Sequence, residues 1–148
     1  SLLMFFLLLA KPATAEIIPD GTLPTNSKVI QQGNTTFIEA GTIKGTNLFH
    51  SFDEFSIFSG NTAYFNNSLN IQNIISRVTG TSISNIDGLI RANGNSNLFL
   101  LNPNGIIFGQ NAKLDIGGSF IGTSANSMKF NDGFEFKATN SESTPLLT

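Results

Sequence analysis

The segment Asn102–Ile106, with the sequence Asn-Pro-Asn-Gly-Ile, constrains this chain most strongly because it joins two apolar strands through a turn. Pro103 fixes its φ angle near about −65°, and Asn104 and Gly105 tolerate positive φ angles, so the chain must change direction here. The flanking runs, Leu98–Leu101 and Ile106–Phe108, are continuously apolar rather than alternating. This pattern is typical of strands buried on both faces or stacked in a β-solenoid. The corner is therefore predicted to be structural first.

Composition restricts both the fold and the kinds of partner. The 148 residues suffice for one domain, and they include 14 Phe, 14 Gly, one Tyr and no Trp. This mixture favours a β interior of phenylalanines with glycine corners. Only 12% of the residues are charged and the net charge is −2, so no charge-driven partner, and no nucleic acid, is expected. The absence of Cys excludes disulfides, thiolate nucleophiles and cysteine metal sites.

A loose internal repeat indicates how the strands are arranged. Asn85–Ile90 is similar to Asn102–Ile107, and 17 residues separate Gly88 from Gly105. Isoleucines in Asn70–Val78 have a weak helical spacing, but Gly80 follows at once, so we expect a strand or one short turn. Short strands with glycine and asparagine corners favour an all-β parallel β-helix, in which rungs recur about every 15 to 25 residues. An antiparallel sandwich or jelly roll is the alternative.

The phenylalanines and the C-terminal turn complete this picture. Asp132-Gly133 between two Phe-containing runs predicts a β-hairpin. Ala138–Thr144 is a polar linker, and residues 141–148 are expected to begin a continuation into further rungs. Leu98, Leu100, Ile106 and Phe108 are predicted to lie in the stack. The residues predicted to stack between rungs are Phe99, Phe108, Phe120, Phe130, Phe134 and Phe136.

The N-terminal residues indicate a destination outside the cytoplasm. Leu2–Ala10 is an apolar run with the length of a signal-peptide core, and Ala13-Thr14-Ala15 is a suitable cleavage site. The run is too short to remain as a membrane span, so no stable membrane insertion is expected. Residues 1–15 are predicted to be an N-terminally clipped signal peptide and residues 16–140 a secreted domain. Glu16–Val29 contains two prolines and Asp20-Gly21, which suits an extended or capping strand.

The residues offer little catalytic chemistry. The single histidine, His50, has Ser51 and Asp53 nearby, but triads assemble across a fold, and no Gly-x-Ser-x-Gly elbow is present. A histidine at a corner or on the surface is therefore predicted. No spacing selects a pair of carboxylates for glycoside chemistry, and no metal or phosphate motif occurs. We predict no catalytic residue, metal or cofactor. The carboxylates considered are Asp53, Glu54, Asp87, Asp115 and Asp132.

Several segments together resemble a known family. They are Ile18–Thr22, Gly45–His50, Ala63–Asn67, Ile83–Ile90 and Asn97–Gly118. In these segments the chain is similar to the two-partner secretion, or haemagglutination activity, domain of filamentous haemagglutinin-like exoproteins, especially the cyanobacterial type.

One family motif is matched without change and another is not. The motif Asn-Pro-(Asn/Ala)-Gly-Ile falls on Asn102, Pro103, Asn104, Gly105 and Ile106. The second signature, Asn-Pro-Asn-Leu, has no counterpart, and the nearest string, Asn66–Leu69, lacks the proline.

The resemblance implies a fold and a partner. The fold would be a right-handed, single-stranded parallel β-helix with an N-terminal capping segment. The partner would be an outer-membrane β-barrel transporter with periplasmic polypeptide-binding domains, and the domain would direct secretion and nucleate folding of a large adhesin-like exoprotein. A carbohydrate-binding module, with cell-surface carbohydrate as partner, and a β-helical polysaccharide enzyme are the alternatives.

Overall fold

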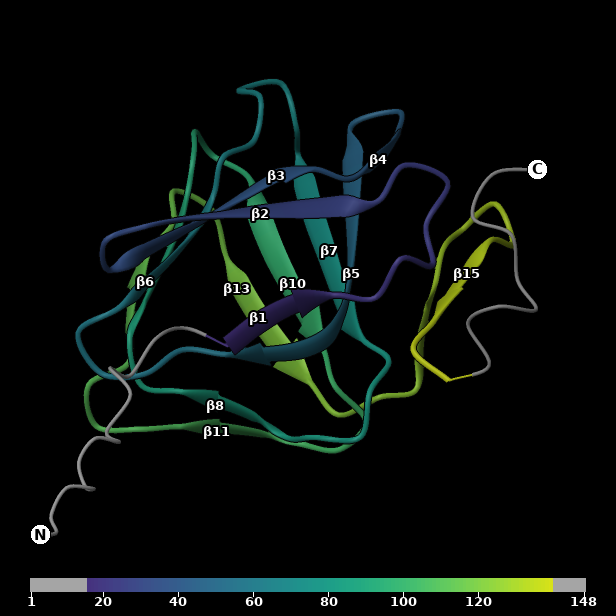
Figure 1. Cartoon of the computed structure of the whole chain (residues 1–148). Helices are drawn as coiled ribbons and strands as arrows, with labels where there is room; N and C mark the ends of the chain where they lie inside the picture. The colour runs from purple at the N-terminus through teal and green to yellow at the C-terminus, as the bar shows by residue number, and fades with distance from the viewer. Residues whose placement is uncertain (1–15, 140–148) are drawn as a thin grey trace, which may run out of the picture.

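The computed structural model describes residues 16–139, which form 15 strands and no helix. The strands wind into a parallel β-solenoid of about four turns (Figure 1). The strands are β1 (Glu16–Pro19), β2 (Ser27–Gln32), β3 (Thr35–Ala40), β4 (Thr42–Lys44), β5 (Asn47–Ser56), β6 (Thr62–Phe65), β7 (Asn73–Val78), β8 (Ser84–Ile86), β9 (Leu89–Ala92), β10 (Asn97–Leu101), β11 (Ile106–Phe108), β12 (Lys113–Asp115), β13 (Phe120–Thr123), β14 (Ser127–Lys129) and β15 (Glu135–Lys137).

Three parallel ladders confirm the predicted solenoid. One sheet has the order β1-β5-β7-β10-β13, a second has the order β12-β9-β6-β3-β2, and β8 pairs with β11. Asn47 pairs with Asn73 and Asn73 with Asn97, so the turns there contain 26 and 24 residues. The 17-residue spacing between the similar segments Asn85–Ile90 and Asn102–Ile107 is therefore not the length of one turn of the solenoid. Gly88 precedes β9 and Gly105 precedes β11, so the two glycines occupy different corners.

Alternation along the strands separates an inner from an outer face. Leu48, Ile74 and Leu98 are paired across β5, β7 and β10 and are at most 5% exposed in the interior. The next residues, including Phe49 and Ile75, belong to a second cluster on the outer face. Both faces of this sheet are thus covered, which explains the continuous apolar run Leu98–Leu101. The segment Asn70–Val78, whose isoleucines have a weak helical spacing, contains strand β7. A strand was one of the two predicted alternatives, the other being one short turn.

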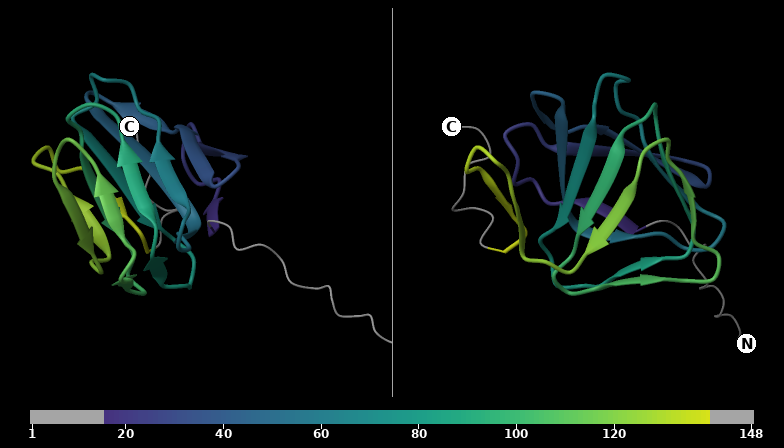
Figure 2. Two further views of the ribbon diagram at one scale, coloured as in Figure 1. Left: turned by 90° about the vertical axis from the view of Figure 1, so that its left-hand side faces the viewer. Right: turned by 180° about the vertical axis from the view of Figure 1, so that it is seen from behind.

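The predicted hairpin around Asp132-Gly133 is confirmed, since β14 and β15 pair in antiparallel fashion. Its phenylalanines do not stack between rungs, which corrects the prediction for Phe130, Phe134 and Phe136. They pack against Phe49 on the outside of the sheet. Figure 2 shows the hairpin in yellow beside the sheet, close to the purple N-terminal segment. The sequence pattern could not distinguish the two faces, because both are apolar.

The two ends of the solenoid differ. At the N-terminal end, β1 and β4 pair in antiparallel fashion with β5, and β2 with β3, which confirms a capping segment. At the other end, the outer edges of β11, β12 and β13 have no partner strand among residues 16–139. Phe108 is 49% exposed there and Ile106 is only half-buried. Phe108 therefore does not lie inside the stack as predicted, because no further rung between residues 16 and 139 covers it.

Two predicted segments cannot be placed. The signal peptide, residues 1–15, and the continuation, residues 141–148, lie outside the described residues. Between residues 16 and 139 no helix occurs that could cross a lipid bilayer.

Candidate functional site

The corner motif is built around a completely buried asparagine. Asn102 is 0% exposed, and its Nδ2 donates to the Ser82 carbonyl oxygen and to Ser84 Oγ, each at 3.0 Å. Its Oδ1 accepts hydrogen bonds from the backbone nitrogen of Asn104 at 2.9 Å and from Asn104 Nδ2 at 3.0 Å. One amide side chain therefore uses its full hydrogen-bonding capacity: two bonds join the corner to the preceding turn of the solenoid, and two close the corner itself.

The other members of the motif shape the turn itself. Gly105 has a φ angle of 116°, which favours glycine, and its nitrogen donates to the Asn102 carbonyl at 2.9 Å. Asn104 Nδ2 also donates to the Gly80 carbonyl at 2.8 Å. Pro103 is half-buried between these asparagines, and Ile106 packs against the main core. Asn102, Asn104 and Ile106 thus contact neighbouring turns, while Gly105 shapes the corner between them.

The corner is linked to the N-terminal cap through Thr79 and Gly80. Thr79 Oγ1 donates a hydrogen bond to Asp20 Oδ2, and Ser51 Oγ donates to the same oxygen at 2.6 Å. The other oxygen, Oδ1, accepts from the backbone nitrogen and hydroxyl of Thr22 at 3.0 and 2.9 Å. The Asp-Gly turn proposed for Asp20 accounts only for the bond from the Thr22 nitrogen. The carboxylate also fastens the cap to β5 and to the segment after β7.

Arg77 extends this network to the C-terminal hairpin. The side chain is 3% exposed, and its Nε donates to Ser51 Oγ at 2.8 Å. One terminal nitrogen donates to Thr22 Oγ1 at 2.9 Å and the other to the Lys137 carbonyl at 2.8 Å. The guanidinium carbon lies 4.4 Å from the centre of the Phe136 ring. We call Asp20, Thr22, Ser51, Arg77 and Thr79 the Asp20–Arg77 network.

The electrostatics of this network suit a structural role. Burial raises the pKa of Asp20, but the hydrogen bonds from Ser51, Thr79 and Thr22 outweigh it, so the pKa lies below its ordinary value. Burial lowers the pKa of Arg77, against the opposing charge of Asp20. Asp20 is thus held as a carboxylate, whereas a general acid needs a raised pKa. Its stabilising contribution is present above pH 3.8 and is lost as the pH falls through its lower folded-state pKa.

A hollow of about 580 Å³ lies where the corner, the cap and the end of the hairpin meet. The sequence prediction located the corner but missed the Asp20–Arg77 network. A signal was present, because Arg77 is a lone charge in the otherwise uncharged strand β7. The residues lining the hollow include Asp20, Asp53, Gly80, Pro103, Asn104 and Thr139.

His50 is buried in the core, which corrects the prediction of a corner or surface position. It is 1% exposed and stacks near the rings of Phe52 and Phe65, with Nδ1 2.9 Å from Ser27 Oγ. Its Nε2 has no hydrogen-bond partner among the described residues. Ser51 points to the opposite face of β5, toward Arg77, because neighbouring residues of a strand alternate. The two side chains therefore do not form a catalytic pair.

Burial of His50 predicts a loss of stability in weak acid. Burial lowers its pKa from 6.5 to about 3, so between these values the unfolded chain binds a proton that the folded chain does not. The free energy of unfolding should fall by about 1.4 kcal/mol per pH unit below pH 6.5, or about 2 kcal/mol at pH 5. Urea unfolding at pH 7.5 and 5 measures this change.

The variant His50→Asn serves as the control, because an asparagine can keep the bond to Ser27 without titrating. The chain has one histidine, so the variant should lose the dependence between pH 7.5 and 5. An unchanged dependence in His50→Asn would assign the effect to other groups.

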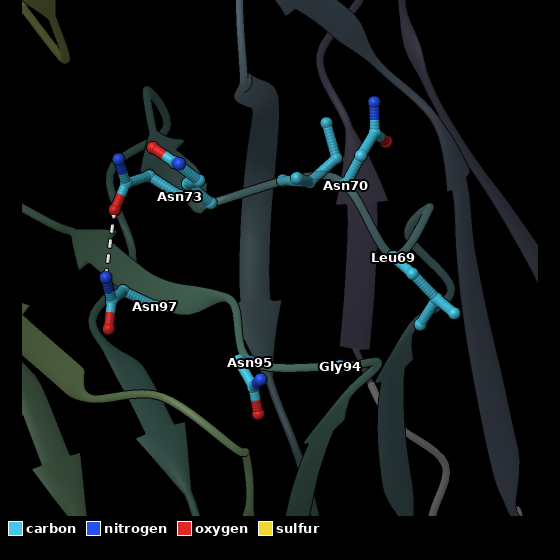
Figure 3. A pocket seen from close by; sticks show the side chains of 8 residues that line it. Leu69, Asn70, Asn73, Gly94, Asn95 and Asn97 are labelled. Carbon is cyan, nitrogen blue, oxygen red and sulfur yellow. Dashed lines mark hydrogen bonds between the residues drawn. The ribbon is translucent and has the colours of Figure 1, made fainter.

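A second hollow, of about 660 Å³, is lined mainly by amide side chains (Figure 3). Asn73 Nδ2 donates to Asn47 Oδ1 at 3.0 Å and Asn97 Nδ2 to Asn73 Oδ1 at 3.1 Å, which forms an asparagine ladder across three turns. Leu69 borders this hollow and is 77% exposed. In the nearby string Asn66–Leu69, Asn67 is buried and accepts a bond from the Asn93 nitrogen at 2.9 Å. This asparagine joins neighbouring turns as Asn102 does.

Comparison with known proteins agrees with this architecture. Residues 15–148 match the TPS secretion domain family, and the chain belongs to this family of two-partner secretion domains. A heme/hemopexin-binding protein of Haemophilus influenzae is 32% identical over 120 residues. The match covers 75% of this chain but only 12% of the Haemophilus protein.

Membership of this family establishes the general role of the chain. The chain is a two-partner secretion domain, and this family implies export across the outer membrane with the help of an outer-membrane transporter.

Proposed function

We propose that residues 16–140 form a secretion module that the periplasmic polypeptide-binding domains of the transporter recognise while it is extended. After export the module folds and nucleates the folding of the protein that follows it. We further propose that residues 1–15 belong to a signal peptide and that residues 141–148 begin a large adhesin-like exoprotein.

The open end of the solenoid is the feature that supports nucleation of folding by this domain. Three strand edges, on β11, β12 and β13, are unpaired among the described residues. Ile107, Leu114 and Ile121 are 53%, 52% and 40% exposed beside them. Unpaired edges with apolar side chains are a template for another rung, and a solenoid grows by adding rungs to such an end.

The N-terminal segments suit recognition by a polypeptide-binding domain. β1, β2 and β4 are the outer strands of the cap, and Ile18 and Ile43 are 46% and 57% exposed on them. In the extended chain, residues 17–58 would offer backbone groups and apolar side chains for strand addition. The net charge of −2 gives little electrostatic steering.

The corner Asn102–Ile106 is proposed to act through the fold. Asn102 is 0% exposed and its hydrogen bonds go to residues of the same domain. In the folded domain its side chain is therefore inaccessible, so only the extended chain could present it to the transporter.

The test uses the full chain and the transporter. We expect residues 1–148 to be secreted only when the transporter is co-expressed. We also expect the chain, unfolded in urea and then diluted into buffer, to bind saturably to the purified periplasmic domains. Binding should change little between about 50 and 500 mM salt, because a charge-driven encounter would weaken steeply over this range. Secretion without the transporter would contradict the partner, and a steep loss with salt would contradict the apolar mode of binding.

The alternative functions have less support. The ring of Tyr64 packs against Phe37 at 5.3 Å, and Arg91 lies over it at 4.7 Å, so it is not an open platform for a sugar. The lowered pKa of Asp20 keeps its carboxylate ionised, so it does not suit the general-acid role in glycoside chemistry. Binding of heme or hemopexin is not carried over from the Haemophilus protein, because the match covers 12% of it.

A further inference from the structure

The hairpin of β14 and β15 packs on the outer face of the sheet, over Phe49 of β5, Ile75 of β7 and Leu101 of β10, and it also reaches the N-terminal cap. Lys44, the last residue of the cap strand β4, forms an ion pair with Asp132 at 3.3 Å, across 88 residues of sequence. The Lys44 nitrogen also lies 4.3 Å from the centre of the Phe134 ring. The yellow hairpin lies beside the N-terminal segments in Figures 1 and 2. The last described strands thus cover part of the first turn.

Phe49 of β5 is the centre of this contact. Its ring centre lies 4.8 Å from that of Phe136 and 5.8 Å from those of Phe130 and Phe134. Phe49 is 0% exposed. Without the hairpin, this large side chain and its neighbour Ile75 would lie on the outer face of the sheet in contact with water. Burial of an aromatic side chain of this size contributes strongly to stability.

The hairpin also reaches the cap itself. Leu23, which follows the Asp20 turn, belongs to the same cluster as Phe49 and Phe136. The Lys137 carbonyl accepts a hydrogen bond from Arg77, whose other bonds go to Ser51 and Thr22. Removal of the hairpin would therefore hydrate Arg77 and weaken the connection between the cap and β5.

We propose that the hairpin, residues 127–138, is a clasp that locks the N-terminal cap. β1 and β4 pair stably with β5 only when the hairpin is docked on Phe49, Lys44 and Arg77. Synthesis proceeds from the N-terminus, so the clasp is the last part of the domain to be made. Residues 16–58 then remain open to the transporter until the clasp arrives. This last consequence rests on the proposed function, whereas the clasp itself does not.

Hydrogen exchange on the full chain tests the clasp without the transporter. In Phe134→Ala, the Asp20 amide, which donates to the Ser51 carbonyl, and the amides of β4 should exchange at least about tenfold faster. The Asn97 amide, which donates to the Gln72 carbonyl between turns, should change less than about twofold. The milder variant Asp132→Asn keeps the aromatic contacts and should accelerate the cap amides about two- to fivefold.

Phe108→Ala is the matched control, because Phe108 makes a similar edge contact with Phe120, at 5.7 Å, but at the open end. It should leave the cap amides unchanged. Cap amides that exchange at the wild-type rate in Phe134→Ala would overturn the proposal. So would equal acceleration of the cap and Asn97 amides, since the hairpin would then be an ordinary part of one cooperative unit. Neither result would affect the assignment as a secretion domain.

Discussion

Replacement of Arg77 by Met should lower the free energy of unfolding by about 3 to 5 kcal/mol, because it breaks a buried, hydrogen-bonded charge network. Met can fill the space of the Arg77 stem, so the loss reports chiefly the missing guanidinium. Its hydrogen bonds to Ser51, Thr22 and the Lys137 carbonyl would all disappear. The half-buried Asp20 carboxylate would lose the opposing charge. Urea unfolding at pH 7.5 measures the change.

Arg91→Met is the control for this prediction. Arg91 also lies over an aromatic ring and forms an ion pair with Asp115 at 3.6 Å, but its side chain is 52% exposed. Exposed pairs of this kind contribute about 0 to 1 kcal/mol. Equal losses in the two arginine variants would contradict a special role for the Asp20–Arg77 network.

Leu100→Ala should remove about 2 to 5 kcal/mol of unfolding free energy by leaving a cavity in the solenoid. Leu100 is 1% exposed, and it is paired with Ser76 on one side and Gly122 on the other. Rigid strands on both sides limit how far the interior can collapse around the missing atoms. Thermal and urea unfolding of the variant measure the loss.

The matched change at the open end is Ile107→Ala. Ile107 is 53% exposed, so its truncation should cost about 0.5 kcal/mol or less. A large loss in Ile107→Ala would show that the end is covered in solution, which would contradict an open template for further rungs.

Local turn chemistry was the part of the fold that the sequence predicted well. Pro103, Asn104 and Gly105 specify a corner by their own conformational preferences, and Asp132-Gly133 specifies a hairpin. The same local rules predicted the extended cap around Asp20. These features depend on a few neighbouring residues, so they can be predicted from the local sequence.

Contacts between distant residues were not predictable in this way. Nothing local determines that Phe136 packs on Phe49 rather than between rungs, because apolar surface is non-directional. The Asp20–Arg77 network joins residues more than 50 positions apart in the sequence, as the 55-residue separation between Arg77 and Thr22 illustrates. The buried position of His50 was readable, however, since it shares one strand face with Leu48 and Phe52.

The central claim is that the corner Asn102–Ile106 serves secretion by supporting the fold. Asn102→Ala leaves the Ser82 carbonyl, Ser84 Oγ and the Asn104 nitrogen without their partner, so it should lower the free energy of unfolding by about 1 to 3 kcal/mol. The most direct measurement compares its secreted yield with that of a Leu100 variant of equal stability, both co-expressed with the transporter. We expect equal losses of secretion in the two variants. An Asn102→Ala protein that keeps the wild-type melting temperature but is not secreted, or that is secreted far less than its stability match, would show that the transporter reads the motif directly.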